Sequence, residues 1–159
     1  MTTLQMELRL ANYFDYRRHI IVPNISWGMH IHECDLFVVS KSGYVTEVEI
    51  KISKGDLLND LKKKHGHKNK MIKKLYFAIP EKLMPYIDSI PDHAGIIVVA
   101  EKQIYRDGFK RGVYIFREAI INKDCVGLDD KQIVKVLSLG AMRIWTLKKK
   151  IQRMYENRK

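Results

Sequence analysis

Two carboxylates and a lysine between residues 33 and 51 have types and spacing suited to metal-assisted chemistry. Glu49, Ile50 and Lys51 alternate along an expected strand, so the carboxylate and the ammonium share one of its faces. Asp35 opens the apolar run of the preceding strand. Two carboxylates one strand width apart can hold Mg²⁺ or Mn²⁺, because these ions prefer hard oxygen ligands. Such an ion neutralises a phosphate and activates water, and a nearby ammonium stabilises developing charge. The combination suits phosphodiester hydrolysis.

A hairpin is expected to bring these residues together. Its strands are predicted over Ile31–Val39 and Tyr44–Ile52, joined by a three-residue loop with Gly43 at the left-handed position. The numbers of paired residues then sum to 84, as for Asp35 and Glu49, which face each other. Like charges facing each other across an antiparallel pair are destabilising, and a bound divalent cation is the simplest explanation for them. The opposite face collects apolar side chains: Cys34, Leu36, Val38, Val48, Ile50 and Ile52.

Other acids of the hairpin offer alternatives. Glu33 would face Lys51 in this register, and the whole face could be solvent-exposed with cross-strand ion pairs worth under about 1 kcal/mol each. Glu33 could also replace Asp35 as a ligand, although the register favours Asp35. Glu47 shares the face, either as a third ligand or as a charge at the rim, and the sequence favours the rim.

A zinc site is a further alternative. His30, His32 and Cys34 alternate, and they offer three zinc donors on one side of a strand. Zinc sites need a fourth ligand and usually have turn-like spacing, however, and Cys34 is expected on the apolar face of the hairpin. The sequence therefore favours Mg²⁺ or Mn²⁺.

The charge of the chain predicts a phosphate-rich partner. Its 29 lysines and arginines outnumber its 18 acids, for a formal charge of +11. Such an excess is typical of proteins that bind nucleic acid or an anionic membrane, although a positive surface can also serve solubility alone. A basic surface beside an acidic pocket favours DNA. The residues predicted to contact it follow the hairpin, with a solvated charge run as the alternative: Lys62, Lys63, Lys64, His65, His67 and Lys68.

Length and composition predict a single domain over residues 1–159, large enough to bury a core without disulfides. The two cysteines, the charged N-terminal segment and the absence of a long apolar run make the cytoplasm the default compartment. A long C-terminal helix is expected to begin at Asp129 or Asp130. Its apolar stripe would serve as core or as a dimer contact, which leaves a homodimer open.

The remaining pattern predicts helices around a mixed sheet. A first helix is expected from Thr2 or Thr3 to about Arg18, with Leu4 and Leu8 on its buried side. Glu7 lies beside that apolar stripe, so its carboxylate either reaches outward or points at a site. Further elements are a helix at 54–64 and strands at 20–22, 75–79, 95–100, 104–105 and 113–117. This order argues for an α/β or α+β sandwich.

The residues of the hairpin resemble the PD-(D/E)XK nuclease superfamily. The triplet Glu49-Ile50-Lys51 matches its acid-x-lysine element, and Asp35 sits where its leading aspartate begins the preceding strand. The residue before Asp35 is Cys34 rather than proline, a proline often absent in the family. The resemblance implies an α/β fold with a restriction-endonuclease-like core: a helix, a three-stranded meander, a second helix and a further strand, which form a mixed central sheet flanked by helices.

The same resemblance implies roles for individual residues. Asp35, Glu49 and the carbonyl of Ile50 would bind Mg²⁺ or Mn²⁺, Lys51 would lie near the attacking water, and Glu7 would be the extra acid of the first helix. The stretch from Glu49 to Asp60 is similar to small stand-alone members of the MmcB type, linked to DNA repair. The expected function is therefore a metal-dependent deoxyribonuclease, with a non-catalytic DNA-binding protein on the same fold as the alternative.

Overall fold

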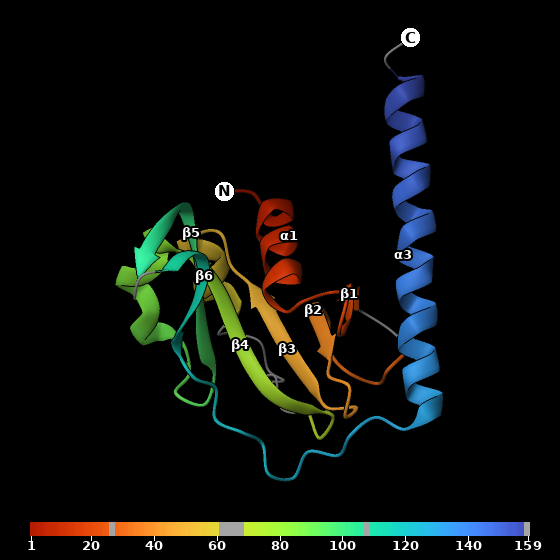
Figure 1. Ribbon diagram of the computed structural model, residues 1–159, viewed down its shortest axis with the longest axis horizontal. Coiled ribbons are helices and arrows are strands. Elements are labelled where there is room, and N and C mark those ends of the chain that lie inside the picture. Colours follow the sequence, from red (N-terminus) through yellow and green to blue (C-terminus); the bar gives the residue numbers. More distant parts are fainter. Residues whose placement is uncertain (26–27, 61–68, 107–108, 158–159) are drawn as a thin grey trace.

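The structure, a computed structural model, describes residues 1–25, 28–60, 69–106 and 109–157 (Figure 1). Its centre is a six-stranded sheet with the strand order β1-β2-β3-β4-β5-β6. The strands are β1 (Ile20–Ile25), β2 (Cys34–Val39), β3 (Val45–Ile50), β4 (Ile72–Pro80), β5 (Gly95–Arg106) and β6 (Phe109–Arg117). The helices are α1 (Thr3–Tyr13), α2 (Lys54–Asp60), the 3₁₀ helix η1 (Glu81–Ser89) and α3 (Asp130–Glu156).

The sheet mixes antiparallel and parallel pairs. β1, β2 and β3 form an antiparallel meander. β4 runs parallel to β3, β5 runs parallel to β4, and β6 returns antiparallel to β5. α2 lies in the connection between β3 and β4, where a parallel pair requires a crossover. The predicted α/β class, with a mixed central sheet flanked by helices, is confirmed.

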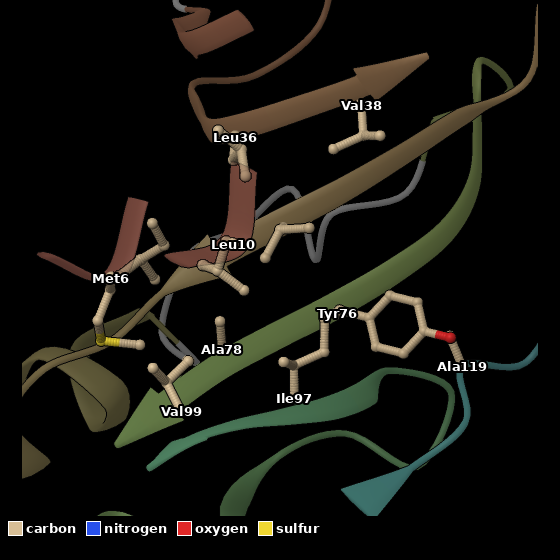
Figure 2. Close-up of a cluster of buried hydrophobic side chains, with 11 residues drawn as sticks. Met6, Leu10, Leu36, Val38, Tyr76, Ala78, Ile97, Val99 and Ala119 are labelled. Carbon is tan, nitrogen blue, oxygen red and sulfur yellow. The ribbon is translucent and has the colours of Figure 1, made fainter. Parts of the chain in front are cut away.

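Helix α1 covers one face of the sheet. Met6 and Leu10 lie one turn apart on the helix, and both are fully buried. They pack against Leu36, Tyr76 and other residues of the central strands (Figure 2). This face also takes Val38, Val48 and Ile50, which the sequence places on the apolar side of the hairpin.

Two predictions for α1 are wrong. Leu4 and Leu8, expected on the buried side, are 63% and 58% exposed. The helix turns Met6 and Leu10 to the sheet instead, and these two residues have the same four-residue spacing, so periodicity alone does not distinguish the two faces. The helix also ends at Tyr13, well before the expected end at Arg18.

The opposite face of the sheet is covered by three helices. The first half of α3 places Val136 and Leu139 against Val22, Phe37 and neighbouring residues of β1–β3. Further along the sheet, α2 and η1 pack against β4 and β5, with these buried side chains: Leu57, Leu75, Phe77, Leu83 and Ile90. Both faces of the β2–β3 hairpin are therefore covered.

Helix α3 begins as predicted, because the side chain of Asp129 accepts a hydrogen bond from the Gln132 N–H in a capping box. Its second half extends beyond the sheet, away from β1 and β2 (Figure 1). The predicted strands differ from the structure mainly in length. β5 is one strand where the sequence predicts separate segments at 95–100 and 104–105, with an irregularity in its pairing between Val99 and Ile104.

Three arginines are fixed by backbone carbonyl groups. Arg9 of α1 donates hydrogen bonds to the carbonyls of residues 100 and 101 at β5. Arg117 at the end of β6 donates to the carbonyls of residues 90, 91 and 94, with N–O distances between 2.8 and 3.0 Å. Arg143 of α3 donates to the carbonyl of Asn24 in β1. These contacts tie helices and loops to the sheet.

Candidate functional site

The predicted register of the β2–β3 hairpin is confirmed. The paired residues are Leu36 with Val48, Phe37 with Glu47, Val38 with Thr46 and Val39 with Val45. In each pair the two residue numbers sum to 84. Gly43 in the connecting loop has a φ of +77°, which is the left-handed conformation expected at that position.

Replacing Gly43 with alanine should therefore destabilise the protein. The left-handed φ disfavours any L side chain, and an added Cβ would lie 3.2 Å from the carbonyl oxygen of Leu128. We expect the free energy of unfolding to fall by about 1–2 kcal/mol. Urea denaturation measures this. The control is Gly55→Ala, because a Cβ at Gly55 meets nothing within 4 Å and its φ is not left-handed. An unchanged denaturation midpoint for Gly43→Ala would contradict this account of the loop.

Asp35, Glu49 and Lys51 come together where β2 begins and β3 ends. The Lys51 Nζ lies 2.7 Å from Glu49 Oε2 and 3.7 Å from Asp35 Oδ2. Asp35 Oδ2 also accepts a hydrogen bond of 2.8 Å from the backbone N–H of Ile50. The backbone N–H of Lys51 donates to the carbonyl of Ala78, which ties the end of β3 to β4. A lysine thus bridges two carboxylates at a fixed point of the sheet.

This group is buried, so the alternative of a solvent-exposed strand face is wrong. Glu49 is 2% exposed and Lys51 is 3% exposed, whereas the Asp35 side chain keeps 31% of its surface accessible. The cover comes from α2 and the neighbouring strand. Phe77 of β4 pairs with Glu49 and so lies on the same face, in the apolar cluster that includes Leu57 of α2.

Burial makes the negative charge of Glu49 costly. It raises the pKa of the Glu49 carboxyl, an effect that the Lys51 ammonium opposes and the Asp35 carboxylate reinforces. A cation beside Glu49 therefore stabilises its ionised form. Lys51 already supplies one such charge, and a divalent ion would supply more.

Glu7 of helix α1 is close enough to Asp35 for the two charges to interact. Burial raises the pKa of Glu7, a hydrogen bond from the Asn24 side chain lowers it, and the charge of Asp35 raises it again. The Glu7 side chain is thus partly buried rather than fully directed into solvent. The contribution of Asn24 was not predicted. Asn24 has a left-handed φ of 54°, a conformation that asparagine adopts more readily than most residues.

A second set of groups lies deeper on the same face. Sγ of Cys34 and carboxylate oxygens of Glu47 and Glu49 lie within 4.8 Å of one another, and all three residues are buried. His32 Nε2 lies 2.5 Å from Glu47 Oε1. Burial raises the pKa of the Cys34 thiol, and the charges of Glu47 and Glu49 raise it further. These three groups could hold a metal ion.

Two expectations for this second set are wrong. Glu47 is not a charge at the rim, because it is fully buried. Cys34 does not join the cluster of Leu36 and Val38. It packs with Val22 and Ile25 at the first residue of β2, and its thiol points toward the carboxylates. Strict alternation is less reliable at a strand end, where the preceding chain turns away from the sheet.

The remaining predicted site residues have different outcomes. Glu33 and His30 are exposed, and neither belongs to the group of Cys34, Glu47 and Glu49. The helix expected at 54–64 is described as far as Asp60, and the Ser53 hydroxyl accepts a hydrogen bond from the Asp56 N–H at its start. The predicted DNA contacts all lie outside the described residues: Lys62, Lys63, Lys64, His65, His67 and Lys68.

Comparison with known proteins supports the fold and gives no information on function. No protein-family model matches the chain, and no curated protein matches it. Among solved structures, the chain is similar to the SPO1766 protein of unknown function from Silicibacter pomeroyi. The TM-score is 0.61 at 15% sequence identity, and the match covers 96% of this chain and 92% of the other. The two proteins share an α/β architecture.

The described part of the chain contains no helix with the length and apolar character needed to cross a membrane.

Proposed function

We propose that this protein is a metal-dependent nuclease that hydrolyses DNA phosphodiester bonds on a restriction-endonuclease-like core of the PD-(D/E)XK type. The observation that carries the proposal is the convergence of Asp35, Glu49 and Lys51 at one point of the β2–β3 hairpin. The element order supports it, since α1, the β1–β3 meander, α2 and β4 follow one another as the resemblance implies. The similarity to MmcB-type repair proteins suggests DNA repair or the processing of phage or mobile-element DNA.

The donor chemistry of the pocket fits Mg²⁺ or Mn²⁺. Asp35 and Glu49 supply carboxylate oxygens, and the resemblance adds the carbonyl of Ile50 as a third hard donor. When bound, such an ion would neutralise the phosphate and supply an activated water. The hydrogen bond from the Ile50 N–H fixes the Asp35 carboxylate against β3, so this ligand would be held in place before any ion arrives.

The other residues would act on charge and position. The Lys51 ammonium, held between two carboxylates, is placed to stabilise negative charge that develops on a phosphate. Burial raises the pKa of Glu7 on α1, and the charge of Asp35 adds to the increase. Glu7 would therefore be suited to exchanging a proton with water or a leaving group.

One observation favours the alternative, a non-catalytic DNA-binding protein. Lys51 lies within ion-pair distance of both Asp35 and Glu49, so the pocket is partly neutralised by the chain itself. A fold that has lost its metal would need this kind of internal counter-ion. The net charge of +11 would then serve binding alone.

Assays with purified protein separate the two functions. We expect cleavage of at least one of four DNA substrates (duplex, nicked, branched and single-stranded) in Mg²⁺ or Mn²⁺, with no cleavage in EDTA. Salt-sensitive binding to these substrates without cleavage in either metal would instead support the non-catalytic alternative. The absence of both binding and cleavage would refute both functions.

A further inference from the structure

Helix α3 presents an apolar surface that the described part of the fold does not cover. The helix has 27 residues, about 40 Å of length at 1.5 Å per residue. Its contacts with the sheet come from its first half, where Val136 and Leu139 are buried and a Cβ at Gly140 would lie 3.3 Å from Val22. Arg143 adds a hydrogen bond to the carbonyl of Asn24. Beyond this point the helix extends past the sheet (Figure 1).

One exposed stripe of α3 follows a heptad pattern and is apolar at every position except Lys148. We call its residues the α3 seam, and their spacing alternates between three and four residues: Val134, Leu137, Ala141, Ile144, Lys148, Ile151 and Tyr155. The large apolar members are between 42% and 68% exposed. Alternating spacing of three and four is the a/d repeat of a coiled coil. Leu137 follows the buried Val136, so the seam lies about 100° around the helix from the face that packs on β1.

With one exception, the charged residues in the second half of α3 lie outside this seam. In the second half of the helix the basic residues lie at heptad positions that point away from a partner: Arg143, Lys149, Lys150 and Arg153. Lys148 is the exception within the seam, and its Nζ lies 5.1 Å from the centre of the Trp145 ring, so its stem follows the helix surface. Trp145, Leu147 and Met154 flank the seam and widen its apolar surface.

We infer that α3 pairs with α3 of a second copy of this chain in an antiparallel coiled coil. Charge sets the direction. In the first half of the helix Lys131 and Lys135 balance Asp129 and Asp130, whereas the second half is strongly basic. Antiparallel pairing therefore places each basic end beside a neutral end and opposes the two helix dipoles, whereas parallel pairing stacks the basic ends. In an antiparallel pair, a positions face d positions. This brings Val134 next to Ile151 of the second copy, Leu137 next to Lys148, and Ala141 next to Ile144. The association does not depend on the proposed nuclease activity.

Sedimentation velocity tests the association with matched variants. The wild-type protein is expected to form a dimer as its concentration rises. Ile144→Glu would bury a charge near the two-fold axis, and we expect it to weaken the dimer at least about 100-fold. Thr146→Glu is the control, because it adds the same charge to the same helix on the side away from the seam. Circular dichroism verifies that both variants keep their helices. A wild-type protein that stays monomeric at every concentration, or equal weakening by the two variants, would overturn the inference.

Disulfide cross-linking tests the direction. In a Cys125→Ser background, the double variant Val134→Cys/Ile151→Cys should cross-link rapidly, because the two positions meet in the antiparallel pair. The single variant Ile151→Cys should not cross-link, since its two cysteines lie toward opposite ends of the antiparallel pair. Rapid cross-linking of the single variant would overturn the antiparallel arrangement.

Discussion

Replacing Asp35 with asparagine is expected to lower metal-dependent DNA cleavage by at least about 100-fold, because it removes a hard anionic ligand from the pocket. The fold should tolerate the change. The Asp35 side chain is partly exposed, and an asparagine oxygen can still accept the hydrogen bond from the Ile50 N–H. Single-turnover cleavage in Mg²⁺ measures the effect, and thermal unfolding verifies the fold.

The matched control for this result is Asp92→Asn. Asp92 is a fully exposed acid, 3.8 Å from Arg117 and far along the chain from the hairpin. The Asp92→Asn variant also loses one negative charge, and we expect it to cleave DNA within about twofold of the wild-type rate. If Asp35→Asn retained full activity, Asp35 would not be a ligand and the assignment of the pocket would fail. An equal loss in both variants would point to net charge rather than to the site.

Replacing Lys51 with methionine is expected to destabilise the folded protein by about 3–5 kcal/mol, the usual cost of removing one partner from a buried ion pair. The Lys51 and Glu49 side chains are only 4% and 2% exposed, so water cannot take over the role of the ammonium. Chemical denaturation measures the loss. The control is Lys74→Met, which breaks a half-exposed pair with Glu118 at 3.5 Å and should cost less than about 1 kcal/mol.

The destabilisation should depend on pH and on metal. Glu49 already has a raised pKa, and removing the Lys51 ammonium raises that pKa further. The Lys51→Met variant should therefore lose most stability at pH values where Glu49 is ionised. The stability difference between Lys51→Met and wild type should shrink as the pH falls and Glu49 becomes protonated. Mg²⁺ or Mn²⁺ should stabilise this variant more than wild type, because the ion replaces the missing positive charge. A pH-independent loss with no response to metal would show that Lys51 acts through packing alone.

The sequence predicted the hairpin well because its information is local. The loop glycine fixes the register, and period-two alternation then places Asp35, Glu49 and Lys51 together. The α/β class followed from the order of apolar runs in the same way. These features need no knowledge of which helix covers which face.

Prediction from the sequence failed where contacts with distant parts of the chain determine which side chains are buried. Burial of Glu47 and Lys51 depends on α2, α3 and the neighbouring strands, and no pattern within the hairpin reveals that its charged face is covered. Cys34 lies at the end of a strand, where alternation no longer predicts which face a side chain is on. Its thiol lies near the carboxylates of Glu47 and Glu49. Leu4 and Leu8 have the spacing of a buried stripe, but Met6 and Leu10 have it too, and the sheet selects the second pair.

The arginines that hold backbone carbonyls have a consequence for affinity. Arg9, Arg117 and Arg143 each donate guanidinium hydrogen bonds to main-chain carbonyl groups. They still contribute to the long-range attraction of a polyanion, but they are not free to swing toward a phosphate and displace its counter-ions. The number of ions released on binding DNA should therefore be smaller than a count of basic residues suggests. The DNA-binding constant should therefore depend less steeply on salt concentration than the net charge suggests, because these arginines have a structural role.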